Sequence, residues 1–139
     1  MRVFLDANIL FSAARTDGAI RRLLQLMRDA GHTLCVDNYV VTEARRNLER
    51  KGASSLSVLD ELLRSMHVAA ATFPVREWAG AVDWLPKKDR PVLVSAIRLH
   101  CDALLTGDRA DFGPGFGRAL GGVALHSPRS LFEQLFPAP

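Results

Sequence analysis

The sequence contains no long apolar run. Its longest stretch without Asp, Glu, Lys or Arg is the eleven residues 65–75, whereas a membrane-spanning helix needs roughly 20 mostly apolar residues. Arg2 and Asp6 flank the first apolar run, which the apolar core of a secretion signal would not tolerate, and no small-residue cleavage pattern follows. We therefore expect no transmembrane helix, and a protein that stays in the cytoplasm.

Cysteine and lysine are both scarce. The two cysteines, Cys35 and Cys101, lie in apolar surroundings without a CxxC or Cys/His cluster, which favours buried reduced thiols over a disulfide or a zinc site. Fifteen of the 18 basic residues are arginines, whose planar fork matches phosphate and carboxylate groups, although coding bias can produce the same split. The net charge of +3 and the sequence pI near 9.3 thus permit a nucleic-acid partner without showing one.

In other respects the composition is that of a globular protein. Hydrophobic residues make up 48% and charged residues 24% of the sequence, and the mean hydropathy is +0.06. These values exclude a disordered or fibrous chain. A length of 139 residues fits one compact domain, so we expect a single domain over residues 1–139 with its own apolar core.

Short apolar segments alternate with amphipathic segments along the chain. The expected strands are residues 2–6, 32–36, 68–72, 103–105 and 123–125. The expected helices are residues 17–30, from Asp37 or Asn38 to about 50, from Ser54 or Ser55 to 66, from Pro74 through Val82, 92–101, and about 128–135. We expect a polar loop at 106–114 and a mobile Gly-rich loop at 113–122. Repeated strand and helix units predict an α/β fold with a central parallel sheet and helices on both faces.

Four acidic residues fall where a parallel sheet would bring them to one edge. Asp6 ends the first strand, and Asp108 follows the strand 103–105. Asp89 begins the helix before that strand, and Glu43 lies in the second turn of the helix after the second strand. In open α/β sheets ligands bind beyond the carboxyl ends of the strands. We expect no Lys or Arg to neutralise this cluster, so its stability requires protonation or a hard divalent cation, Mg²⁺ or Mn²⁺ rather than Zn²⁺.

The same four acids lie in stretches that resemble the motifs of the PIN-domain nucleases, a family that includes the VapC-type toxins. The stretches are VFLDANIL at 3–10, VVTEARRNL at 40–48, KKDRPVLVSAI at 87–97 and LLTGDRADF at 104–112. They follow the family's order from one end of the chain to the other. The resemblance implies a Rossmann-like PIN domain and a metal-dependent endoribonuclease that hydrolyses phosphodiester bonds in RNA.

The resemblance also assigns roles to individual positions. The catalytic metal ligands that it implies are Asp6, Glu43, Asp89 and Asp108, with Asn8 and Thr106 orienting ligands or bound water. Ala7 stands where many members have Ser or Thr, which removes a hydroxyl but no carboxylate. Asp111 is a second acid of the last motif, and members differ in which of these acids faces the metal. We expect Asp108 to be the ligand and Asp111 an auxiliary one.

The charge distribution suits a polyanionic substrate. Without the four proposed ligands the chain has 18 basic residues against 11 acidic ones, a net charge of +7, so an acidic cleft would lie in a basic surface. Arg109 lies between Asp108 and Asp111, and we expect it either to bind a phosphate or to form a salt bridge with Asp111 or Asp102. If the protein is a toxin, the resemblance implies an antitoxin that occludes the acidic cleft, and a homodimer.

Each proposed site residue also has a purely structural interpretation. Asp6 and Asp89 can cap helices, Glu43 can be a solvated helix residue, Asp108 can be a turn residue, and Asn8 and Thr106 can serve the fold alone. Trp78 and Trp84 are expected in the core or a dimer contact rather than in a base-stacking platform, and the remaining acids as caps or surface charges.

Two further functional classes compete with the toxin. A small-molecule phosphatase is disfavoured because Asp6-Ala7-Asn8 lacks the second acid of an Asp-x-Asp pair. A PIN module that binds RNA or protein without cutting is disfavoured because all four acids are present. An orphan or housekeeping nuclease stays open as an alternative to the toxin.

Overall fold

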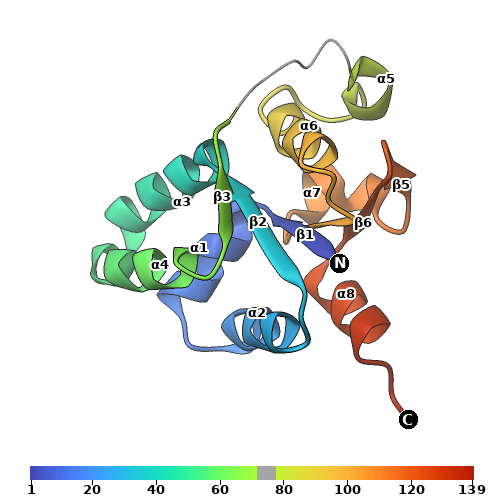
Figure 1. Ribbon diagram of the computed structural model, residues 1–139. Coiled ribbons are helices and arrows are strands. Elements are labelled where there is room, and N and C mark those ends of the chain that lie inside the picture. The colour runs from blue at the N-terminus through green and yellow to red at the C-terminus, as the bar shows by residue number, and fades with distance from the viewer. Residues whose placement is uncertain (72–77) are drawn as a thin grey trace.

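A six-stranded sheet forms the centre of the protein in a computed structural model that describes residues 1–71 and 78–139 (Figure 1). The strands lie in the order β3-β2-β1-β4-β6-β5. Their bounds are β1 (Arg2–Leu5), β2 (Thr33–Asp37), β3 (His67–Ala69), β4 (Ala103–Leu105), β5 (Ala119–Leu120) and β6 (Val123–His126). The predicted α/β fold with a central parallel sheet is confirmed, and the added edge strand β5, which pairs antiparallel with β6, makes the whole sheet mostly parallel.

Helices lie on both sides of this sheet, as the sequence predicts. Their bounds are α1 (Ala7–Arg15), α2 (Ala19–Asp29), α3 (Asn38–Lys51), α4 (Leu56–Leu63), α5 (Ala79–Val82), α6 (Arg90–Arg98), α7 (Arg109–Phe112) and α8 (Pro128–Leu135), with 3₁₀ turns η1 (Ala53–Ser55) and η3 (Gly113–Gly115). In Figure 1, α1, α3 and α4 lie on one side of the strands, and α6 and α7 lie on the other. Within the described residues, no helix has both the length and the apolar character needed to cross a membrane.

The core follows from the apolar strands at the centre of the sheet. Val3, Phe4 and Leu5 of β1 are fully buried, and Phe4 pairs with Cys35 of β2 on one side and Leu104 of β4 on the other. A strand covered by helices on both faces needs apolar residues at consecutive positions, and β1 and β4 have them. Cys35 and Cys101 are buried free thiols, as predicted.

Several elements differ from the sequence-based expectations. The expected helix ranges do not include α1, although Asp6 can cap a helix at this place and does so in the structure; five of the nine residues of α1 are buried. The expected polar loop at 106–114 contains α7 and the first two residues of η3. The expected mobile loop at 113–122 contains β5, which is held by antiparallel pairing to β6.

Other differences are confined to the ends of elements. The helix expected at 92–101 is α6, which ends earlier, and His100 then takes a left-handed backbone with φ of 54°. The third strand is shorter than expected, and its expected end at residue 72 lies outside the described residues, as does the expected helix start at Pro74. Neither Ser54 nor Ser55 caps α4 through its side chain.

Candidate metal centre at the carboxyl edge of the sheet

Asp6 lies at the end of β1, where it caps α1. One carboxylate oxygen, Oδ1, accepts the Ala7 N–H at 2.8 Å, and the other, Oδ2, accepts the Thr106 hydroxyl at 2.8 Å. Only 5% of Asp6 is exposed, and this burial raises its pKa from 3.8 to about 6. The two hydrogen bonds oppose the rise in the pKa, and the charges of Glu43 and Asp108 add to it.

Asn8 and Thr106 join the ends of two neighbouring strands around Asp6. The Asn8 amide donates to Asp6 Oδ2 at 3.1 Å and to Thr106 Oγ1 at 3.3 Å, while its Oδ1 accepts the Gly107 N–H at 2.8 Å. Thr106, which is fully buried, also accepts the Asp108 N–H at 3.1 Å. The Thr106 hydroxyl therefore connects the Asp6 carboxylate to the backbone of Asp108.

Three carboxylates gather in front of this network. Asp89, Asp108 and Asp111 each offer a carboxylate oxygen, and these three atoms lie within 4.8 Å of one another. Asp89 precedes α6, and Asp108 caps α7 by accepting the Asp111 N–H at 3.0 Å. We refer to Asp89, Asp108 and Asp111 as the acid cluster.

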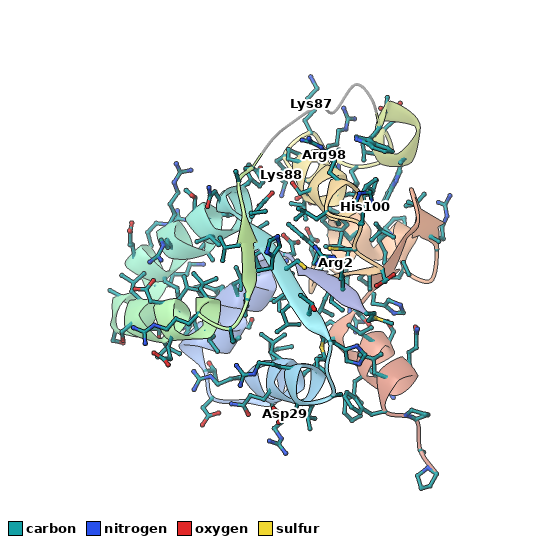
Figure 2. The ribbon with its side chains drawn as sticks, viewed as in Figure 1. Arg2, Asp29, Lys87, Lys88, Arg98 and His100 are labelled. Carbon is teal, nitrogen blue, oxygen red and sulfur yellow. The ribbon has the colours of Figure 1, made fainter. Side chains whose placement is uncertain are left out.

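Lys88 partly neutralises the acid cluster, contrary to the sequence-based expectation that no Lys or Arg does so. Its Nζ lies 3.2 Å from Asp111 Oδ2 and 3.9 Å from Asp89 Oδ2. In Figure 2, Lys88 lies between β3 and α6, whereas the neighbouring Lys87 points away from the molecule; the Lys88 side chain is nevertheless 71% exposed. The motif KKD thus supplies one cation to the cluster together with its acid, and the two lysines could not be told apart by residue type alone.

Burial and proton sharing set the charge state of the acid cluster. Burial is the largest cause that raises the pKa of Asp89 to about 7, and proximity to the Asp111 carboxyl adds to it. The same proximity, together with Lys88, holds the pKa of Asp111 below its ordinary value. Near neutral pH the cluster therefore holds part of a proton, mainly on Asp89.

The donor set of the acid cluster fits a hard divalent cation. Asp89 Oδ2 is buried and has no hydrogen-bond partner among the residues that the structure describes. A buried carboxylate oxygen left without a partner is costly unless a proton or a cation satisfies it. Three carboxylates without a sulfur or imidazole donor suit Mg²⁺ or Mn²⁺.

Glu43 is not part of the acid cluster. It is exposed on α3, although its charge is near enough to raise the pKa of both Asp6 and Tyr39. Tyr39, one turn before it, donates its hydroxyl to the Lys88 carbonyl at 2.7 Å. The structure thus places Glu43 beside the candidate site and Asp6 behind it, while Asp111 lies directly in the cluster.

Arg109 is exposed at the first residue of α7. Neither salt bridge considered from the sequence forms: Asp111 pairs with Lys88, and Asp102 accepts the Arg2 N–H at 2.7 Å. The Arg109 guanidinium is therefore available to a ligand at the edge of the acid cluster.

Asp37 is a buried acid whose connection the sequence does not reveal. It is 1% exposed, caps α3 by accepting the Val40 N–H at 3.1 Å, and accepts the Ser95 hydroxyl of α6. The cap is predictable, but the partner on α6 is 58 residues away. This hydrogen bond links α3, which carries Glu43, to α6, which follows Asp89. Asp29, one of the acids not expected in the site, lies at the far end of the molecule from Lys88 (Figure 2).

The two tryptophans pack against the core, as predicted. Trp84 meets Phe112 edge to face with ring centroids 6.4 Å apart, and its indole N–H donates to the Ala81 carbonyl at 2.7 Å. Trp78 is partly buried against the same core.

Comparisons with known proteins place the chain in a family. Three similar solved structures share the fold. VapBC2 from Rickettsia felis, bound to a promoter DNA fragment, has a TM-score of 0.69 and 17% identity, with 91% of this chain and 98% of that chain covered. The sarcin-ricin loop cleaving toxin VapC20 from Mycobacterium tuberculosis has a TM-score of 0.60 and 13% identity, with 85% and 98% covered, and FitAcB from Neisseria gonorrhoeae has a TM-score of 0.60 and 17% identity, with 91% and 98% covered. No curated protein matches the chain. The model of the PIN domain family matches residues 2–110, a span that includes Asp6, Glu43, Asp89 and Asp108. The chain therefore belongs to the PIN domain family.

Proposed function

We propose that this protein is an Mg²⁺- or Mn²⁺-dependent endoribonuclease that hydrolyses RNA phosphodiester bonds. The observation that carries the proposal is the acid cluster, whose three carboxylate oxygens lie within 4.8 Å of one another at the carboxyl edge of a PIN-domain sheet. The buried Oδ2 of Asp89 has no hydrogen-bond partner among the described residues and meets Lys88 Nζ only at 3.9 Å, which supports a cation at this place. A cation bound there would lower the pKa of a water molecule and neutralise charge on the reacting phosphate.

The residues around that cation would have different roles. Asp89, Asp108 and Asp111 would hold the metal, with Asp111 as a full member rather than only an auxiliary. Asp6 would supply a negative charge from behind, and Asn8 and Thr106 hold its carboxylate in place by hydrogen bonds.

Two exposed residues complete the proposed site. Glu43 is exposed on α3 close to Asp6, where it would orient water or contribute a further carboxylate ligand. Arg109 would bind a phosphate next to the cluster through its planar donor fork.

We further propose that the protein acts as the toxin of a toxin–antitoxin pair. Support comes from the structural likeness to chains of VapBC and FitAB complexes, and to VapC20, which is described as a sarcin-ricin loop cleaving toxin. A protein antitoxin is the partner that this proposal requires, and a homodimer is the proposed assembly. A gene for a short DNA-binding protein next to this one would support the assignment.

A cleavage assay tests the proposed activity. The purified protein is incubated with a fluorescent single-stranded or loop RNA in Mg²⁺, in Mn²⁺ and in excess EDTA, and Asp108→Asn serves as the control for contaminating nuclease. We expect cleavage by the parent protein only with a divalent cation, and none by Asp108→Asn. Undiminished cleavage in EDTA would contradict the metal mechanism, and binding without cleavage in every condition would favour a binding module.

A further inference from the structure

Two open hollows lie along α3. One hollow of about 490 Å³ is lined by Asn38, Tyr39, Thr42, Glu43, Arg46 and Ala71. A second hollow of about 440 Å³ is lined by Glu43, Arg46, Asn47, Glu49 and Arg50. Both hollows are lined by Glu43 and Arg46, and we refer to the two together as the α3 groove.

The α3 groove begins at the candidate metal centre. The Tyr39 hydroxyl donates to the Lys88 carbonyl at 2.7 Å, which fixes the first turn of α3 to the residue before Asp89. Burial raises the pKa of Tyr39, and the nearby charges of Glu43, Asp89 and Asp6 raise it further, so this wall of the groove lies close to the acids. A chain that reacts at the cluster could therefore continue directly into the groove.

The arginines of α3 differ in how they are engaged. Arg45 forms an ion pair with Asp60, and Arg50 donates to the Asn47 side chain at 2.8 Å. Within the part of the chain that the structure describes, Arg46 has no carboxylate within 4.0 Å and no hydrogen-bond partner. It is also exposed and lies in the wall of both hollows.

The spacing along α3 orders these groups by distance from the cluster. With a rise of about 1.5 Å per residue, Arg46 lies about 4.5 Å along the helix beyond Glu43, and Arg50 about 6 Å beyond Arg46. Positions 39, 43, 46 and 50 share one helix face, because they are three or four residues apart. Successive cations on one face suit successive phosphates of one strand.

On the basis of the proposed nuclease function, we propose that the α3 groove holds the RNA strand on one side of the cleaved bond, with Arg46 binding the first phosphate beyond the cluster. Arg50 binds the following phosphate after giving up its contact with Asn47. The exposed Arg46 guanidinium, which has no carboxylate partner among the described residues, can offer its planar donor fork to a phosphate in this polar, open groove.

Binding measurements on a cleavage-deficient protein test the groove separately from catalysis. Arg46→Ala, Arg46→Lys and Arg50→Ala are each combined with Asp108→Asn, and fluorescence anisotropy of a labelled single-stranded RNA is followed over a range of salt concentrations. Arg64→Ala is the matched control. Arg64 is an exposed arginine just before β3, at the amino ends of the strands, whereas the acid cluster lies at their carboxyl ends.

We expect Arg46→Ala to weaken RNA binding about tenfold, as for loss of one charge-assisted contact, and to reduce the salt slope by about 0.7. Arg46→Lys keeps part of the affinity, Arg50→Ala has a smaller effect, and Arg64→Ala has none. With the catalytic acids intact, Arg46→Ala raises KM and leaves kcat within roughly twofold of the parent value.

Other outcomes overturn one proposal without the other. Unchanged affinity and salt slope in Arg46→Ala, at an unchanged melting temperature, would exclude the groove as the RNA path. Weaker binding of a protein antitoxin with unchanged RNA binding would instead assign the groove to that partner and overturn our inference. If the parent protein never cleaves RNA but its binding still depends on Arg46, the groove assignment stands and the nuclease proposal fails.

Discussion

At the scale of single residues, the Thr106 hydroxyl is the most connected group of the candidate site. It donates to Asp6 Oδ2 and accepts from the Asp108 backbone and the Asn8 amide. Sequence resemblance assigns it an orienting role but cannot show how many partners share the one hydroxyl. Its complete burial means that water cannot replace it.

Thr106→Val, which keeps the shape and removes the hydroxyl, is expected to lower the free energy of unfolding by about 1 to 3 kcal/mol. The pKa of Asp6 should rise further, because the Thr106 hydrogen bond now lowers it. Urea unfolding and the pH dependence of RNA cleavage measure both effects. Thr106→Ser keeps the hydroxyl and serves as the control; equal stability of the Val variant and the parent would show that the network contributes little.

The raised pKa of Asp89 gives stability a dependence on pH. Folded Asp89 binds its proton up to about pH 7, whereas the unfolded residue releases it near pH 4, so stability is lost as the pH rises through this window. In EDTA, Asp89→Asn should therefore be more stable than the parent at pH 7.5, and the difference should shrink towards pH 5. Urea unfolding of both proteins at the two pH values measures this difference.

The comparison with Asp89→Asn cancels the opposite contributions of His32 and His126. Burial holds the pKa of His32 and His126 below the ordinary value, so each histidine adds stability as the pH rises, equally in both proteins. A difference between parent and variant that does not change with pH would contradict the raised pKa of Asp89.

At the scale of elements, the sequence predicts best what depends on local pattern. The helix expected at about 128–135 is α8 with the same bounds, because Ser127 caps it and Pro128 starts it. The two-residue strand β5 is too short for any pattern, and it exists because β6 offers it hydrogen-bonding partners. Strand pairing of this kind cannot be predicted from the sequence of the short segment alone.

The turn before β5 depends on a glycine for space rather than for backbone conformation. A Cβ atom on Gly115 would lie 2.6 Å from the Trp84 ring and 2.7 Å from the Leu125 side chain. We expect Gly115→Ala to lower the free energy of unfolding by about 1 to 3 kcal/mol through overpacking.

Gly80→Ala is the matched control for Gly115→Ala. Gly80 lies in α5, and a Cβ there would meet nothing within 4 Å, so alanine should be neutral or stabilise by about 0.4 to 1 kcal/mol. Thermal unfolding of the two variants beside the parent measures the contrast. If Gly115→Ala melts at the same temperature as Gly80→Ala, the close packing of Trp84 against the turn is wrong.

At the scale of the whole molecule, the candidate site is assembled from distant segments by one edge of the sheet. Asp6 and Asp108 could be placed at this edge from the sequence, because the ends of parallel strands meet there. The exclusion of Glu43 from the acid cluster could not be foreseen, since it depends on how α3 lies against the sheet. The same holds for Lys88, whose backbone carbonyl is fixed by Tyr39 from another element.

Calorimetric titration of Mn²⁺ into the metal-free protein tests the central claim, that the acid cluster is a metal site, most directly. The parent and Asp108→Asn are titrated at pH 7 in two buffers of different ionisation enthalpy, so that released protons are counted together with bound metal. We predict saturable Mn²⁺ binding by the parent, with release of the proton held mainly by Asp89, and loss of this binding in Asp108→Asn. Equal binding by the two proteins, or no binding by the parent, would contradict the claim.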